Sequence, residues 1–333
     1  MRSKKNVETI TLEENQTLNK AFDSYLSMAE NAVDWTLFCT YQLKPNFTEG
    51  NYKILQLPSM QIVYTSMSGG VMFDYVVPEG CIVFSVMKNI SHKACIEQMK
   101  LETGMIAVTD DSKIYNFMCS DKVELLDVSL KPEADATLLQ ALRKVIDCYV
   151  VDAESKMTTL LMDVVNTYAE EEHIDAKSAE KIEQEMTRKM LQLLENEEVH
   201  TPRFTKSEMI ALEIKCALFQ HMDHTMSVSE IAQKYGISEK SLQNSFKALF
   251  DLTPNQYMRL LKLNLVHHDL VRGSASKTAV WKIAQKWGFR HMGRFSKYYK
   301  ELFGENPSET LRNPSPIEDG MKVHCVERQE QMY

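Results

Sequence analysis

Two stretches in the C-terminal third place hydrogen-bonding and basic side chains where they could read the edges of nucleic-acid bases. Glutamine and asparagine can each pair with adenine through two hydrogen bonds, and lysine and arginine contact guanine or phosphate. The first stretch supplies the candidate DNA-contacting residues Lys240, Ser241, Gln243, Asn244 and Lys247. The second supplies Arg290, His291, Met292, Arg294, Ser296 and Lys297. Together the two sets predict a face that binds double-stranded DNA.

Both sets are expected to lie on amphipathic helices, because large apolar residues recur among them every three or four positions. The polar residues between them then fall on the opposite face of each helix. The apolar positions are Leu242, Phe246 and Leu249 in the first stretch and Phe295, Tyr299 and Leu302 in the second. Each helix is therefore predicted to pack on a core and present its polar face to solvent.

A short motif, Ile-Ala-Gln-Lys-aromatic-Gly, precedes both helices, at residues 231–236 and 283–288. Its glycines, Gly236 and Gly288, supply a turn in which a positive φ is easy only without a Cβ. A helix, a tight turn containing glycine and a second helix make a helix-turn-helix. The sequence therefore predicts two helix-turn-helix motifs in tandem, joined by a long helix over residues 254–273.

This tandem arrangement resembles the DNA-binding domain of the AraC/XylS family of bacterial transcription regulators. The resemblance covers residues 205–312, and its most specific part is WGFRHMGRFSKYYKELFGENP at 287–307. Lys262 departs from the arginine usual in the family's linker helix, which keeps the charge but loses the bidentate fork. Within the family, the whole chain looks most like the ethanolamine-utilisation regulators. The resemblance implies a transcription regulator, expected to be an activator, that binds promoter DNA and works with RNA polymerase.

Other residues of this region are expected to have structural roles. Trp281 and Trp287 are predicted to lie in the core of the second motif, and His267 and His268 are predicted to be exposed on the linker helix. Three helix starts match the capping-box pattern, in which a hydroxyl and a carboxylate or amide three residues later satisfy free backbone N–H groups. These pairs are Thr205 with Glu208, Ser227 with Glu230, and Thr253 with Gln256.

The charge of the chain is divided unevenly. Residues 206–312 hold 16 Lys and Arg against 10 Asp and Glu, a net charge of +6. The other residues hold 22 against 36, a net charge of −14. A basic module attached to an acidic one fits nucleic-acid binding by the C-terminal part, although the whole chain carries a net charge of −8.

Composition and cysteine usage favour a cytoplasmic protein. The 333 residues are 44% hydrophobic and 25% charged, as in soluble globular proteins. We find neither an apolar run long enough to span a membrane nor a secretory signal, so no membrane partner is expected. The seven cysteines are scattered without metal-type spacing, which argues against a disulfide framework and a zinc site. Because the sequence lacks catalytic and nucleotide-binding motifs, we expect that the protein is not an enzyme and that it binds no cofactor.

The N-terminal part is predicted to be rich in strands. About eight short apolar runs occur between residues 30 and 130 at roughly ten-residue spacing, separated by turn residues. This rhythm predicts an antiparallel barrel or jelly roll. After Lys131-Pro132, apolar residues recur at helical spacing in three segments up to Leu194. These apolar stripes exceed what one barrel wall could cover, so the segments are expected to form a homodimer interface.

The predicted class is therefore α+β, with an N-terminal cupin-like antiparallel β-barrel with flanking helices and a C-terminal all-α tandem helix-turn-helix domain. The expected divisions are a cupin-like sensor barrel at 1–133, a helical dimerisation or connecting region at 134–198, a linker at 199–204, the DNA-binding domain at 205–312 and a flexible tail at 313–333.

A barrel joined to such a domain resembles the cupin-like sensor arrangement of the family, which implies a small-molecule effector. His92 is the one histidine of the barrel, so no metal site of the cupin type is expected. The candidate effector-binding residues are Phe38, Tyr64, Phe73, Tyr75, Phe84 and Tyr115. An alternative hypothesis is a fully packed barrel without a ligand, since eight-stranded barrels can be filled by side chains. Two other hypotheses are an N-terminal part that acts as a protein-interaction module, and an enzyme targeted to DNA.

Overall fold

The computed structural model describes residues 12–45, 49–97, 99–220, 227–273 and 279–313. The side chains of Phe38, Cys39, Cys216, Phe219 and Gln220 also lie outside the described part, as does nearly all of the predicted C-terminal tail. The chain divides into two compact units. Unit 1 comprises Met1–Leu37, Thr48–Ser68 and Asp74–Arg203, and unit 2 comprises Phe38–Phe47, Gly69–Phe73 and Phe204–Tyr333.

The strands form two antiparallel sheets. The larger has the order β1-β3-β4-β11-β6-β9-β12, with β1 (Thr17–Phe22), β3 (Gly50–Gln56), β4 (Met60–Met67), β6 (Ile82–Ile90), β9 (Met105–Asp110), β11 (Val123–Leu130) and β12 (Tyr149–Val151). The smaller has the order β2-β5-β10-β7-β8, with β2 (Thr36–Gln42), β5 (Val71–Val76), β7 (Ala94–Ile96), β8 (Met99–Lys100) and β10 (Tyr115–Cys119). The short helix α1 (Tyr25–Glu30) follows β1.

The prediction of a closed β-barrel is wrong in one respect. Among the described residues, the larger sheet ends at β1 on one side and at β12 on the other, and the two sheets are not closed into a barrel. The rhythm of apolar runs and turns predicts that strands form, but closure depends on pairing between distant segments. Here β12 comes from beyond the predicted barrel and pairs with β9, Val150 opposite Ile106.

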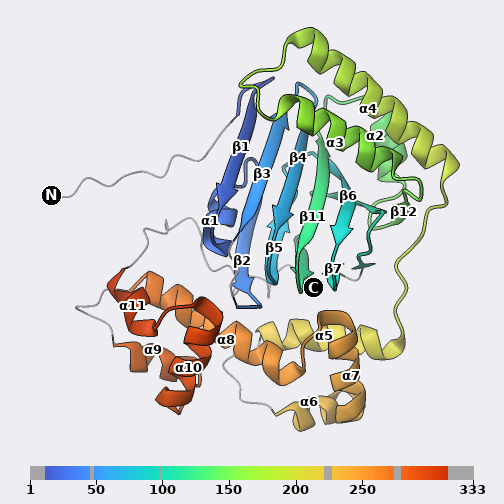
Figure 1. The fold of residues 1–333 in the computed structure, drawn as a ribbon. Helices are drawn as coiled ribbons and strands as arrows, with labels where there is room; N and C mark the ends of the chain where they lie inside the picture. The colour runs from blue at the N-terminus through green and yellow to red at the C-terminus, as the bar shows by residue number, and fades with distance from the viewer. Residues whose placement is uncertain (1–11, 46–48, 98, 221–226, 274–278, 314–333) are drawn as a thin grey trace. The chain divides into compact units, whose positions relative to one another are not determined.

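One face of the larger sheet carries the main core of unit 1. Register places Val128 on β11 between Ile62 on β4 and Phe84 on β6. These side chains are 0% exposed, and they pack with residues of the three helices that follow the sheet in sequence. Those helices are α2 (Ala136–Arg143), α3 (Lys156–Tyr168) and α4 (Ala176–Asn196), and they lie across this face of the sheet (Figure 1).

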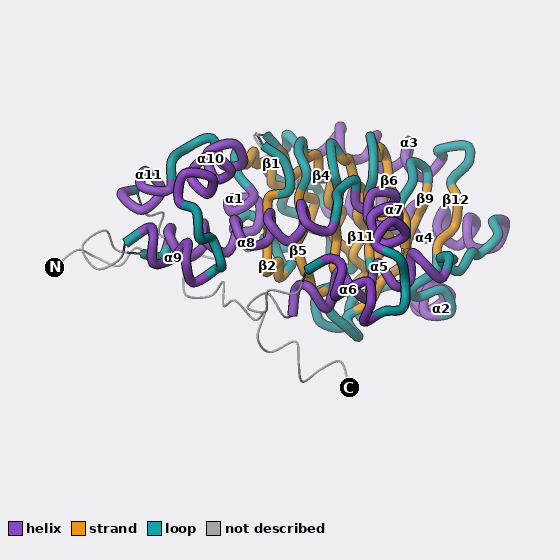
Figure 2. Tube along the Cα trace, turned by 90° about the horizontal axis from the view of Figure 1, so that it is seen from below, coloured by secondary structure: helices purple, strands orange, loops and turns teal. Residues whose placement is uncertain are grey.

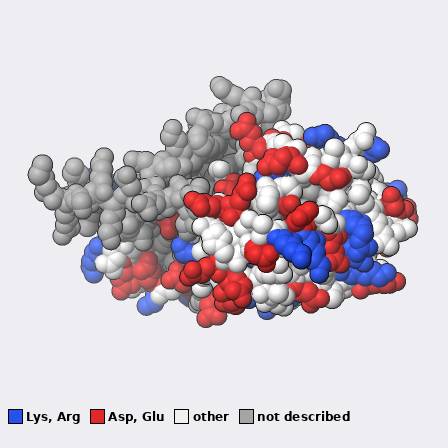
Figure 3. Space-filling model, turned by 90° about the horizontal axis from the view of Figure 1, so that it is seen from above, with Lys and Arg blue, Asp and Glu red and all other residues white. Residues whose placement is uncertain are grey.

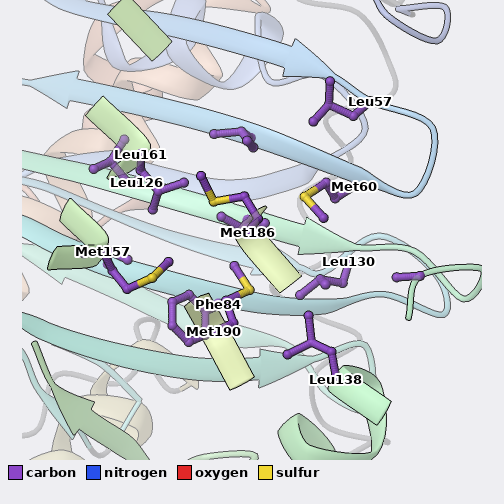
Figure 4. Close-up of a cluster of buried hydrophobic side chains, with 14 of the residues drawn as sticks. Leu57, Met60, Phe84, Leu126, Leu130, Leu138, Met157, Leu161, Met186 and Met190 are labelled. Atoms are coloured by element: carbon purple, nitrogen blue, oxygen red, sulfur yellow. The ribbon is translucent and has the colours of Figure 1, made fainter. Parts of the chain in front are cut away.

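The apolar stripes of these helices are largely covered within the chain. Met157 and Leu161 on α3 and Met186 and Met190 on α4 are at most 1% exposed and point into the sheet core (Figure 4). The buried Asp152 caps the start of α3, because its carboxylate accepts hydrogen bonds from the backbone N–H groups of Lys156, Met157 and Thr158. The stripes therefore do not by themselves require a second subunit.

Unit 2 contains all the later helices. They are α5 (Lys206–Gln220), α6 (Val228–Lys234), α7 (Glu239–Phe250), α8 (Pro254–Val271), α9 (Val280–Lys286), α10 (Met292–Phe303) and α11 (Pro307–Arg312). The long helix α8 lies between one group made of α5, α6 and α7 and another made of α9, α10 and α11, in both views (Figures 1 and 2). The three predicted capping boxes are confirmed.

The prediction that His267 and His268 are exposed is wrong, because α8 is surrounded. Both side chains are 8% exposed. Nδ1 of His267 lies 2.7 Å from Oη of Tyr299, and the His268 ring stacks on Tyr41 at 5.7 Å. Next to them the buried Asn264 amide pairs with the backbone N–H and C=O of Gln42, at 2.7 and 2.8 Å. Because α8 has neighbours on several sides, it buries polar residues that the spacing of apolar residues predicts to be exposed.

The two tryptophans of unit 2 differ in environment. Trp287 is half-buried, packs on the second core and donates its indole N–H to Asp269 at 2.8 Å. Trp281 is 54% exposed, which corrects the prediction that it belongs to the core. The residues that α9 buries are Ile283 and Ala284.

We predict that Leu161→Ala lowers the free energy of unfolding by about 2–5 kcal/mol, since it leaves a cavity between α3 and the sheet. Denaturant unfolding would measure the loss, with the exposed Thr159→Ala on the same helix as a control expected to change stability by less than about 0.5 kcal/mol. The loss should be equal at low and high protein concentration. A loss that disappears at high concentration would place this stripe in a subunit interface instead.

We also predict acid sensitivity from the buried histidines. Burial lowers the pKa of His267 to about 3 and that of His268 to about 4, so both are neutral in the folded protein. In the unfolded chain they titrate near about 6.5. The unfolded chain therefore binds more protons between about pH 6.5 and 4, and the free energy of unfolding falls as the pH is lowered through this window.

The measurement is denaturant unfolding of wild type and His267→Gln at about pH 7, 6 and 5. The variant should lose less stability on acidification, by up to about 1.4 kcal/mol per pH unit. His173→Gln removes an exposed histidine of unit 1 and serves as the matched control. Parallel pH profiles for wild type and His267→Gln would contradict the assignment.

Candidate nucleic-acid interface

The first helix-turn-helix is formed by α6 and α7. Ser227 caps α6 in a capping box with Glu230, and the helix ends at a turn in which Gly236 has a φ of 65°. A side chain at this position would be strained by the left-handed backbone. Ser238 then caps α7, its hydroxyl accepting from the backbone N–H of Ser241 at 3.1 Å. The repeated motif therefore sets the angle at which α7 starts.

The helix α7 separates its apolar and polar residues as predicted. Leu242, Phe246 and Leu249 are at most 4% exposed and pack inward. The opposite face presents Lys240, Gln243, Asn244 and Lys247 to solvent, with Ser241 half-buried. The structure thus brings the first set of candidate residues together on one helix face.

The second helix-turn-helix repeats the arrangement in α9 and α10. Gly288 in the turn has a φ of 84°, and Phe295, Tyr299 and Leu302 are at most 3% exposed. Arg290, His291, Arg294 and Lys297 are exposed, and Ser296 is half-buried. Met292 differs from the prediction that it points outward. It is half-buried and packs against the second core.

The linker helix α8 holds both motifs. Near its start, the Tyr257 ring lies 5.9 Å from Phe246 and 6.3 Å from Phe250 of α7. The Arg259 guanidinium lies 4.4 Å from the centre of the Tyr298 ring of α10, a cation–π contact. Farther along, Leu263, Val266 and Leu270 join the core of the second motif. Both reading helices are thus anchored on one rigid element.

Lys262 reaches the turn of the second motif. Its ammonium lies 3.4 Å from where a Cβ on Gly288 would stand, and burial lowers the pKa of the lysine. A larger residue at 288 would be strained by the positive φ and would also crowd this ammonium. Lys262 is therefore a half-buried contact between α8 and the turn.

The polar faces of α7 and α10 are predominantly basic. The exposed cations are Lys240, Lys247, Arg290, Arg294 and Lys297. Among them, Lys297 forms an ion pair with Glu301 on the same helix, and this pair is long at 3.8 Å. Exposed ion pairs of this kind leave the cation available for other anions. On the face shown in Figure 3, by contrast, acidic and basic side chains are interspersed and neither sign covers the surface.

The candidate effector-binding residues do not line one space. Phe84 and Tyr64 belong to the helix-covered core of the larger sheet, which corrects the prediction that they line a barrel interior. Phe73 is buried on β5, and the Phe38 side chain lies outside the described part. The structure does bring Tyr75 and Tyr115 together, with ring centres 5.4 Å apart and nearly parallel.

Unit 1 contains a cavity of about 330 Å³, and Tyr115 is the one predicted effector-binding residue among its described lining residues. Ile96, Met99 and Pro202 form apolar parts of its wall, and Thr109, Glu97, Lys113 and Asp147 supply polar groups. These residues come from separate strands and loops, so no local motif signals them.

The described residues contain no group of three His, Cys, Asp or Glu side chains that could hold a metal ion. None of the described helices has the length and apolar character to cross a bilayer.

Known proteins share the C-terminal part of the chain. A family model described as a helix-turn-helix domain matches residues 220–313. The probable thc operon regulatory protein of Rhodococcus erythropolis is 37% identical over 92 residues, which are 28% of each chain. The XylDLEGF operon transcriptional activator of Pseudomonas putida is 36% identical over 93 residues, 28% of this chain and 29% of the relative. The similarity therefore spans less than a third of either relative.

Among solved structures, a probable AraC family transcriptional regulator from Rhodopseudomonas palustris is 26% identical and covers 34% of this chain and 100% of its own, with a TM-score of 0.29. The match to the family model spans the two helix-turn-helix motifs and the linker helix described above. Residues 220–313 of this chain therefore match a helix-turn-helix domain, and part of the chain is similar in sequence to transcription regulators of the AraC/XylS type.

Proposed function

We propose that this protein is a sequence-specific transcription activator that binds duplex promoter DNA with α7 and α10 in successive segments of the major groove. The observation that carries the proposal is the pair of exposed polar faces, one on each helix, opposite apolar faces anchored on α8. Glutamine and asparagine on α7 would read bases, and the lysines and arginines of both helices would contact guanine or phosphate. The names of the relatives that are similar to part of this chain support regulation of transcription.

The remaining parts of the proposal concern partners. A small effector bound by unit 1 would regulate DNA binding, RNA polymerase would be the target of activation, and the protein would act in the cytoplasm as a homodimer. Dimers let two weak DNA sites act together. Because the stripes of α3 and α4 are largely covered, a dimer contact there would use the half-buried Leu160, Val164 and Leu193. The likeness to ethanolamine-utilisation regulators remains a prediction.

We predict that Gln243→Ala and Asn244→Ala relax base preference, each by about 1–3 kcal/mol of discrimination if the contact is bidentate. Duplexes selected by the full chain from a randomised pool would be compared with scrambled duplexes in a binding titration. Asn255→Ala, an exposed residue at the start of α8, is the matched control. Unchanged discrimination in both α7 variants would show that this face does not read bases.

We further predict that removing two lysines from the first motif weakens the salt dependence of binding. Each phosphate contact contributes about one to the slope of log affinity against log salt concentration. The variant Lys240→Ala/Lys247→Ala should therefore lower the slope by up to about two and weaken binding to all sequences alike. Lys181→Ala, exposed on α4, should leave the slope unchanged. An unchanged slope in the double variant would remove α7 from the phosphate-binding surface.

A further inference from the structure

The first helix of the second motif begins with an exposed aromatic residue. Trp281, near the start of α9, is 54% exposed, the highest fraction among the large apolar side chains that the structure describes. The ammonium of Lys282 lies 5.7 Å from the centre of its ring. The inner face of the helix, Ile283 and Ala284, is buried in the core that Phe295 of α10 also joins. Tryptophan is enriched at interfaces, since its ring offers a large apolar area and its N–H a donor.

The first motif has different residues at the same two positions. The repeated Ile-Ala-Gln-Lys-aromatic-Gly aligns α6 with α9, so Ser229 corresponds to Trp281 and Glu230 to Lys282. Glu230 has a structural role, because its carboxylate completes the capping box at the start of α6. Helix α9 starts without a side-chain cap, so Lys282 does not have this role. The pair on α9 is therefore not explained by the requirements of the helix itself.

The second motif is also the more basic of the two. Residues 280–303 hold six Lys and Arg against one Glu, a net charge of +5, whereas residues 228–250 hold three Lys against two Glu, a net charge of +1. The second motif therefore attracts a polyanion more strongly. Of the two lysines on α9, Lys286 already pairs with Asp269 at 2.8 Å. Lys282 is exposed, and its cation–π contact leaves the N–H donors of the ammonium available for an anion.

We propose that Trp281 and Lys282 contact the sugar-phosphate backbone of duplex DNA at the edge of the groove segment that α10 occupies. In helix-turn-helix proteins the second helix enters the major groove while the first crosses the backbone. The ring of Trp281 packs on a deoxyribose and its indole N–H donates to a phosphate oxygen, while Lys282 binds a neighbouring phosphate. As a DNA contact the pair rests on the proposed function, and it adds a backbone contact that the first motif lacks.

The two motifs then contribute differently to binding. Contacts to phosphate and sugar position a protein on the duplex but carry no sequence information. The two amides among the candidate residues, Gln243 and Asn244, both lie on α7. The first motif therefore supplies more of the base discrimination, and the second, with its additional contact from α9, supplies more of the salt-dependent affinity.

The test measures binding of the full chain to the selected duplex and to scrambled duplexes over a salt series. Lys282→Ala should weaken binding to both by the same factor, about three- to tenfold, and lower the slope of log affinity against log salt concentration by about one. Trp281→Ala should weaken both equally but leave the slope unchanged, since the ring carries no charge. Trp281→Phe keeps part of the packing surface and should recover part of the loss. Ser229→Ala, exposed at the corresponding position of α6, is the matched control and should bind like wild type.

Tryptophan fluorescence supplies a readout that does not depend on affinity. Acrylamide should quench a component of the wild-type emission that Trp281→Phe lacks, and saturating duplex should protect that component. Equal quenching with and without DNA, or wild-type affinity in both alanine variants, would overturn the proposal. Loss of discrimination in Trp281→Ala would assign the ring to base reading and would also overturn it. A wild-type chain that binds no duplex would overturn the proposed function and this contact together, so the two kinds of failure are distinguishable.

Discussion

The fold of unit 2 depends on one constraint: each reading helix must bury an apolar face on α8 and still leave its opposite face in solvent. Phe246 and Phe295 satisfy the first half of this requirement and are at most 1% exposed. Short turns with positive-φ glycines satisfy the second, because they set the entry angle of each helix without a side chain in the way. The polar faces that carry the proposed function are a consequence of this packing.

The helix-turn-helix motifs were predictable because their signals are local. Helical spacing, capping pairs and the glycine turn all lie within a few residues of the elements they define, and the exposed set on α7 follows from Leu242, Phe246 and Leu249. The burial of His268 was not predictable, because it depends on Tyr41, more than two hundred residues earlier in the chain. Trp281 shows the converse, since a large aromatic residue at a plausible core position remains exposed.

The N-terminal part shows the same limit. The spacing of apolar runs indicated that this part is rich in strands, but closure and the course of the sheets required pairings such as β12 with β9. The effector candidates were chosen as aromatic residues on predicted strands, and alternation along a strand sends such residues to either face. Tyr115 lies in the wall of the cavity, whereas Phe84 lies in the helix-covered core. Thr109 and Asp147 carry no motif, so only the three-dimensional arrangement could identify them.

The central claim is that α7 and α10 read DNA together from one scaffold. Hydroxyl-radical footprinting of the full chain on a selected duplex tests it most directly, with cleavage mapped on both strands. We expect two protected stretches of DNA backbone, flanking major-groove segments about one helical turn apart, with protection near one segment lost in a variant of α7 and near the other in a variant of α10. A single protected segment, unaffected by changes in α10, would contradict it.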